Sequence, residues 1–234
     1  MNALKAELSK AFALPAVWAG LALTVLGCTA IEVLTASRGE ATGTESLPLG
    51  TVGAVVIGVV AISSEYTTNS ADAGGGRQIT TTLTTIPSRA RVLLAKAITI
   101  ILLIVLSALL AMPICIGIAR PSSSASEVLT SCLGATLYWV FSGLLGFAIA
   151  VILRNGVVPL IVLILNSSLV SVSLLLTKLT PLAHWLPDLA GRRLFGGVRT
   201  VDGGLAAVPG GFVMAGWALL LCLLAGFVFA RRDA

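Results

Sequence analysis

Residues 65–96, EYTTNSADAGGGRQITTTLTTIPSRARVLLAK, form the longest polar run in a chain that is otherwise mostly apolar. One apolar run, 47–63, ends just before this segment, and another, 92–118, follows from it. Lipid cannot hydrogen-bond a free backbone, so a polar segment between two membrane-length runs must lie outside the hydrocarbon. Its basic residues, Arg77, Arg89, Arg91 and Lys96, predict a cytoplasmic location by the positive-inside rule. We therefore expect a cytoplasmic loop at 65–91.

The composition is that of an integral membrane protein. Of the 234 residues, 57% are hydrophobic and 11% are charged, and the mean hydropathy is +1.03. Soluble domains carry about 25% charged residues, and no stretch outside the apolar runs is long enough to bury a core. The net charge of +5 is explained by basic residues that face anionic lipid headgroups, so no nucleic-acid partner is expected.

The apolar pattern predicts an all-α fold with six transmembrane helices in a single domain, 1–234. A span needs about 20 residues. The expected spans are 14–34, 47–63, 92–118, 128–153, 157–176 and 208–230. Before them, Leu4, Leu8 and Phe12 recur on one face of 2–12, with Lys5, Glu7 and Lys10 toward the other side. This spacing predicts an amphipathic helix lying at the membrane surface.

Six spans place both termini on the cytoplasmic side, which then holds the larger share of the basic residues. Most of the basic residues outside lie in one long extracellular segment, 177–204, where the positive-inside rule is weakest and where Trp185 is expected to anchor at the interface. The two halves show no sequence repeat, which argues against secondary transporters built from repeats.

The chain carries few residues suited to catalysis, and we do not expect an enzyme. It has no G-x-x-x-x-G-K-[ST] sequence, so it is not expected to hydrolyse ATP. Its only histidine is His184, and its four cysteines show no C-x-x-C spacing. We therefore expect no metal site and no cofactor bound by this chain, with the cysteines serving in packing.

Polar residues within spans are the candidates for a transport pathway. Glu32 lies near the outer end of the first span, where it is either interfacial or lines a path. The fifth span is the most polar of the six. Its candidate pathway residues are Asn166, Ser167, Ser171 and Ser173. Such residues also commonly form hydrogen bonds between helices, and the sequence leaves both roles open.

Within the central loop, Pro87 separates a short segment, 77–85, from the third span, because proline is poorly tolerated inside a helix. Ile79 and Leu83 are one helical turn apart in that segment. The segment is therefore either an apolar knob that docks into a partner or an ordinary solvated loop.

The order Glu65-Tyr66, Arg77, Thr82-Leu83, Pro87, Arg89, Ala95-Lys96 resembles the loop signature of type-2 ATP-binding-cassette (ABC) exporter permeases of Gram-positive bacteria. The plan of a surface helix, six spans and a longer outer segment before the last span is also similar to that family.

This resemblance implies a transport subunit in the bacterial plasma membrane. Its cytoplasmic loop would dock on a separate ABC ATPase subunit, which binds ATP and Mg²⁺, and a second permease copy or paralogue would complete the complex. The coupling residues would be Glu65, Tyr66, Arg77, Ile79, Leu83, Pro87 and Arg89. The cargo would be amphipathic or hydrophobic, such as a peptide antibiotic, a drug or a lipid-like molecule. The alternative is a membrane sensor or scaffold that does not transport and whose loop binds a cytoplasmic regulator.

Overall fold

The structure is a computed structural model that describes residues 2–39, 41, 43, 46–66, 82, 88–121, 123–167, 172–195 and 204–231. Every regular element in these residues is a helix. The α-helices are α1 (Asn2–Ala13), α2 (Pro15–Ser37), α3 (Leu47–Ser63), α5 (Arg89–Ala119), α6 (Ala125–Leu153), α7 (Val157–Ser167), α8 (Val172–Thr177), α9 (Pro187–Ala190) and α10 (Ala207–Arg231). The 3₁₀ turns are η1 (Ser64–Tyr66), η3 (Pro181–Trp185) and η4 (Arg192–Phe195).

Five helices in the described residues are long and apolar enough to cross a membrane: α2, α3, α5, α6 and α10. The chain is thus a multi-pass, all-α membrane protein. Local sequence explains several of the helix ends. Pro15 starts α2 at a position where a helix loses nothing from the missing N–H, and the Ser124 hydroxyl accepts a hydrogen bond from the Glu127 N–H at the start of α6.

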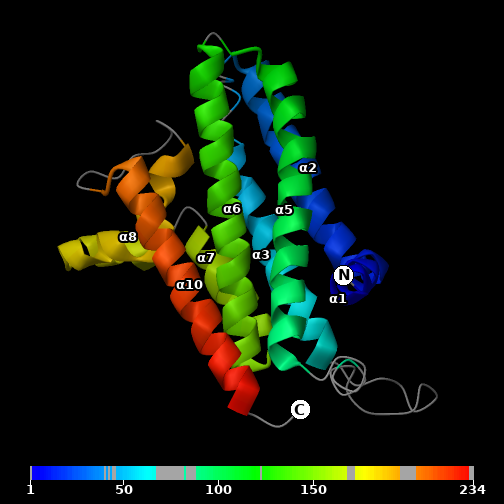
Figure 1. Cartoon of the computed structure of the whole chain (residues 1–234). Helices are drawn as coiled ribbons and strands as arrows, with labels where there is room; N and C mark the ends of the chain where they lie inside the picture. The colour runs from blue at the N-terminus through cyan, green and yellow to red at the C-terminus, as the bar shows by residue number, and fades with distance from the viewer. Residues whose placement is uncertain are drawn as a thin grey trace.

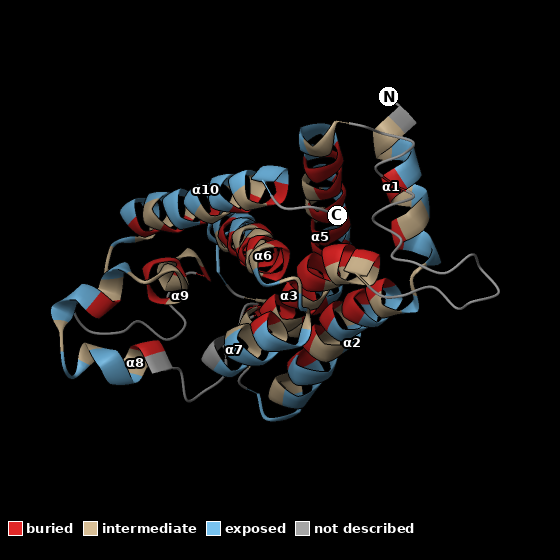
Figure 2. Cartoon of the chain, turned by 90° about the horizontal axis from the view of Figure 1, so that it is seen from below, coloured by how far each residue is buried: buried red, intermediate tan, exposed pale blue. Residues whose placement is uncertain are grey.

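The long helices run side by side, with α3 in the middle and most of its residues buried (Figures 1 and 2). Two glycines let its backbone approach its neighbours closely. A Cβ at Gly53 would overlap the Thr24 hydroxyl of α2, and one at Gly58 would overlap the Gly143 carbonyl of α6. Close contact at small residues is how helices associate in lipid, where apolar burial supplies little driving force. Glycines therefore place α3 at the centre of the bundle.

The outward face of α5 indicates where the hydrocarbon lies. Its exposed large apolar residues extend from Leu94 to Ile114. At about 1.5 Å per residue these two positions are about 30 Å apart along the helix, which matches the thickness of a bilayer core. We call the end of the bundle where α3 ends and α5 begins the loop end; the last turn of α10 lies at the same end (Figure 1).

The predicted fifth span, 157–176, is not one continuous helix in the described residues. It contains α7 and α8, and neither is long enough to cross a bilayer. Figure 1 shows α8 lying across the direction of the long helices. Among the described residues, five continuous spans are found instead of the six that were predicted.

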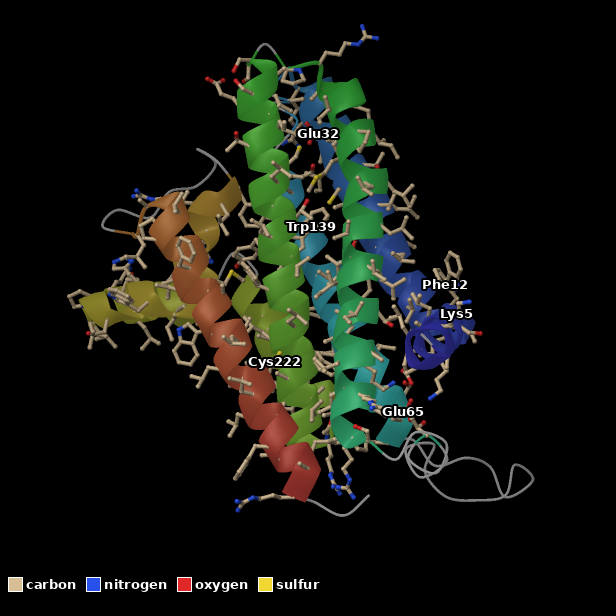
Figure 3. The ribbon with its side chains drawn as sticks, viewed as in Figure 1. Lys5, Phe12, Glu32, Glu65, Trp139 and Cys222 are labelled. Atoms are coloured by element: carbon tan, nitrogen blue, oxygen red, sulfur yellow. The ribbon has the colours of Figure 1, made fainter. Side chains whose placement is uncertain are left out.

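The surface helix α1 forms where it was predicted, but its orientation differs from the expected one. Glu7 and Ala11 face the protein and are buried, whereas Phe12 is 41% exposed. Glu7 thus packs against the bundle, whereas Phe12 and Lys5 point outward (Figure 3). The expectation that Glu7 lies on a solvated face was wrong, because it assumed that α1 had no charged partner in the bundle.

Candidate functional site

Four charged side chains meet at the loop end of the bundle, and we call them the charge cluster: Glu7 and Lys10 of α1, Glu65 of η1 and Lys96 of α5. The Lys96 ammonium pairs with Glu7 Oε2 and lies 2.9 Å from Glu65 Oε1. The Lys10 ammonium lies 3.1 Å from Glu7 Oε1 and 3.2 Å from Glu65 Oε1. Each carboxylate therefore bridges both lysines, and the cluster has no net charge.

Every N–H of the two ammonium groups has an acceptor. Lys96 donates to both carboxylates and to the Ala61 carbonyl at 3.1 Å. Lys10 donates to both carboxylates and to the Thr82 hydroxyl at 2.9 Å. An ammonium has three donors, so neither lysine has one to spare.

These ion pairs are buried, so removing one partner costs more free energy than it would in a surface ion pair. The side chains of Glu7, Glu65 and Lys96 are at most 4% exposed, and Lys10 is half-buried. Exposed pairs contribute about 0–1 kcal/mol, whereas removing one partner of a buried pair costs about 3–5 kcal/mol because a buried charge is left unpaired. Separating one charged side chain from the cluster therefore costs several kcal/mol of free energy, because the charge that it leaves behind is buried and unpaired.

The cluster ties together parts of the chain that are distant in sequence. It connects the surface helix, the end of α3, the start of α5 and, through Thr82, the central loop. Thr82 is the one residue between 67 and 87 that the structure describes, and it is buried. Its hydroxyl donates to Glu65 Oε2 at 2.9 Å. A displacement of the loop at Thr82 would therefore act directly on the charges that hold α1 and α5.

Arg89, a predicted coupling residue, ties the start of α5 to the end of α10. Its guanidinium donates to the Phe229 carbonyl at 2.9 Å and lies 6.0 Å from the centre of the Phe229 ring. The last carbonyls of a helix have no partner within the helix and carry its partial negative charge, so a cation is favourable there.

Tyr66, also a predicted coupling residue, meets the end of α6. The Arg154 guanidinium lies 6.0 Å from the centre of the Tyr66 ring. Arg154 ends α6 in the left-handed conformation, and the following Asn155 accepts a hydrogen bond from the Val157 N–H at 2.7 Å. Three of the coupling candidates are described by the structure: Glu65, Tyr66 and Arg89. Each of them therefore connects two different helices at the loop end of the bundle.

The remaining coupling candidates, Arg77, Ile79, Leu83 and Pro87, lie outside the described residues. So does Ser171 among the pathway candidates, and the side chains of Asn166 and Ser167, in the last turn of α7, are not described either. Ser173 is buried on α8. No pathway lining can be assembled from the fifth-span residues that the structure describes.

Glu32 lies near the opposite end of the bundle and is fully buried (Figure 3). Its Oε1 accepts the Gly43 N–H at 2.9 Å, which fixes the connection between α2 and α3 where Gly43 has a φ of +80°. Its Oε2 has no hydrogen-bond partner among the described residues. In Figures 1 and 2, α2 and α8 lie on different sides of the bundle, so Glu32 and Ser173 do not share one lining.

Glu7, Lys10 and Lys96 were not predicted as site residues from the sequence. One signal was available: Lys96 falls four positions inside the predicted third span, where a charge needs a partner. The nearest acids by topology are Glu65, at the end of the preceding span, and Glu7, in the surface helix.

Comparison of the chain with protein-family models and with curated proteins gives no match.

Proposed function

We propose that this chain is the membrane-spanning permease subunit of an ATP-driven exporter, moved by a separate cytoplasmic ATPase. In this proposal α7 and α8 together form the fifth of six crossings, as in type-2 ABC exporters. Both termini and the central loop face the cytoplasm of a bacterial cell. A second copy or a paralogue completes the complex, and the cargo is amphipathic or hydrophobic.

The observation that carries this proposal is the connection from the central loop to the charge cluster. Thr82 lies in the segment 77–85 that the sequence predicts to dock on a partner, and it hydrogen-bonds both Glu65 and Lys10. The cluster in turn holds α1 to the end of α3 and to the start of α5. A partner that binds one position of the loop better than another would therefore bias the arrangement of these helices.

The energy for such a movement has to come from outside the chain. The sequence has no phosphate-binding loop, and no group of metal-ligating side chains occurs in the described residues. An ion-driven pump would use several buried acids along a pathway. Of the buried acids in the described residues, Glu7 and Glu65 are engaged with lysines, and Glu32 lies alone near the opposite end of the bundle, where it accepts the Gly43 N–H. An ATPase docked at the loop supplies both the energy and the point of attachment.

The test is whether ATP hydrolysis by the associated ATPase depends on the apolar pair of the loop. The double variant Ile79→Asp, Leu83→Asp introduces two charges into the proposed docking surface. We expect it to abolish co-purification of the ATPase or to reduce cargo-stimulated hydrolysis at least tenfold. The matched control is the double variant Leu179→Asp, Leu182→Asp, which introduces the same two charges at residues that are 82% and 74% exposed in the 177–204 segment.

Two outcomes would refute the proposal. In one, the double variant retains a fully active ATPase, which would mean that 77–85 is not the coupling segment. In the other, the chain binds a cytoplasmic regulator that hydrolyses no nucleotide, which would favour the sensor or scaffold function.

A further inference from the structure

Beside the charge cluster lies a pocket of about 140 Å³, between α1 and the loop ends of α3 and α5. It is lined by Glu7, Lys10, Ala11, Ala13, Leu14, Ala61, Ser64, Glu65, Lys96 and Thr99. In Figure 3 this region lies between α1 and the base of α5, near the label of Glu65. Ala13 is the exposed residue among those lining it, and Lys10, Leu14 and Ser64 are partly exposed. The pocket thus opens at the bend between α1 and α2.

The opening lies at the level of lipid headgroups. Next to it, the rings of Phe12 and Trp18 are 5.8 Å apart and both are exposed. The Trp18 indole donates to the Phe12 carbonyl at 2.8 Å, in the way that tryptophan satisfies its N–H at a membrane interface. Lys96 is two residues from Leu94, the first exposed apolar residue of α5 on this side. The pocket therefore sits at the edge of the hydrocarbon.

Thr99 and Thr51 differ from the other threonines in the long helices, because each is buried and its hydroxyl has no hydrogen-bond partner among the described residues; of the two, Thr99 lines the pocket. The hydroxyls of Thr24, Thr29, Thr130 and Thr136 each donate to the carbonyl four residues earlier. Thr99 is only 2% exposed, yet its hydroxyl has no hydrogen-bond partner among the described residues. A buried hydroxyl without a partner costs about 1–3 kcal/mol, and Thr99 lines the pocket. Its hydroxyl is a free polar contact for a molecule bound there.

The charge cluster can still accept hydrogen bonds, but its lysines cannot donate further ones. Both lysines use all their donors, whereas each Glu7 oxygen accepts one hydrogen bond from the described residues and a carboxylate oxygen can accept two. The two lysines and two glutamates cancel in charge, so a ligand with net charge is not favoured. A zwitterion whose positive end carries N–H donors matches these features, with its negative end left at the opening.

We propose that this pocket binds the headgroup of a zwitterionic lipid with a primary ammonium, the chemistry of phosphatidylethanolamine, from the adjacent leaflet. The ammonium donates to Thr99 and to the carboxylates, and the phosphate stays at the opening. The volume of about 140 Å³ is larger than a single water needs, so the pocket has room for a group as small as an ethanolammonium. The proposal does not depend on the transport function.

The experiment compares two lipids that differ only in N–H donors. The full chain, purified in detergent, is titrated with phosphatidylethanolamine or with phosphatidylcholine, whose trimethylammonium has no N–H, and bound lipid is counted by native mass spectrometry. We expect phosphatidylethanolamine to bind about 2- to 10-fold more tightly, the contribution of one hydrogen bond. Thr99→Val should remove this preference. Thr29→Val should retain it, because the Thr29 hydroxyl bonds only within its own helix.

A second variant tests the same pocket in case Thr99→Val does not fold. Ala13→Leu narrows the opening of the pocket and should weaken phosphatidylethanolamine binding, whereas Ala19→Leu, at an exposed position of α2, should not. Equal binding of the two lipids, a preference for anionic phosphatidylglycerol, or a preference that survives Thr99→Val would each overturn the proposal. Free ethanolamine phosphate is tested in parallel. If it competes fully at equal concentration, the site takes the soluble headgroup and not the lipid.

Discussion

Replacing Lys96 by methionine tests the charge cluster most severely. Methionine keeps the length and apolar stem of lysine but removes the ammonium that bonds Glu7, Glu65 and the Ala61 carbonyl. Lys10 alone then faces two carboxylates that are at most 3% exposed. The variant leaves uncompensated negative charge in a buried site.

The expected cost follows from this burial. Removing one partner of a buried ion pair costs about 3–5 kcal/mol, and we expect Lys96→Met to fall in that range. Adding Glu7→Gln restores neutrality, because one cation and one anion have then been removed. The double variant should therefore be more stable than the sum of the two single effects, with a coupling of about 1–3 kcal/mol.

The measurement is the free energy of unfolding in mixed micelles, followed by tryptophan fluorescence. Lys5→Met is the matched control: it makes the same change in charge on the same protein, at an exposed residue of α1 that forms no ion pair with the described part of the chain. We expect Lys5→Met to change stability by less than about 0.5 kcal/mol. A loss of under 1 kcal/mol for Lys96→Met, or strict additivity with Glu7→Gln, would show that the cluster does not form as described.

Two further variants test the packing of the bundle by the same unfolding measurement. Trp139→Phe removes the indole N–H that donates to the buried Leu47 carbonyl at 2.9 Å, and should cost about 1–3 kcal/mol, whereas Trp185→Phe, at an exposed residue, should be nearly neutral. Gly58→Ala places a methyl group against the Gly143 carbonyl and should cost about 1–3 kcal/mol. Gly226→Ala meets open space, so an equal loss there would contradict the close approach of α3 and α6.

The long helices could be predicted because each is an apolar run that ends at a strong local signal. The predicted span 47–63 coincides with α3, since Pro48 starts it and polar residues follow it. Pro15 likewise starts α2. The signals are local, so they can be read without knowing the rest of the fold.

The direction of α8, across that of the long helices, could not be predicted from length and hydropathy alone. The stretch 157–176 is as apolar as a span, and its Asn and Ser residues are compatible with both a continuous helix and a broken one. Which one forms depends on how the neighbouring helices pack.

The charge cluster was missed because its members are contributed by three separate elements. Glu7 and Lys10 fit a solvated helix face when α1 is considered alone. Only the arrangement of α1 against α5 brings Glu7 to Lys96, which is 89 residues away in sequence. The pairing is a tertiary contact, and periodicity within one helix carries no information about it.

The ATP-hydrolysis rate of the complex isolated with the chain decides whether a nucleotide-hydrolysing partner acts on this chain through its loop. We expect an ATPase to accompany the chain and its hydrolysis rate to respond to added cargo, and we expect this response to be lost in the variant Ile79→Asp, Leu83→Asp. A chain that transports cargo in purified vesicles with no hydrolysing partner present would contradict this expectation.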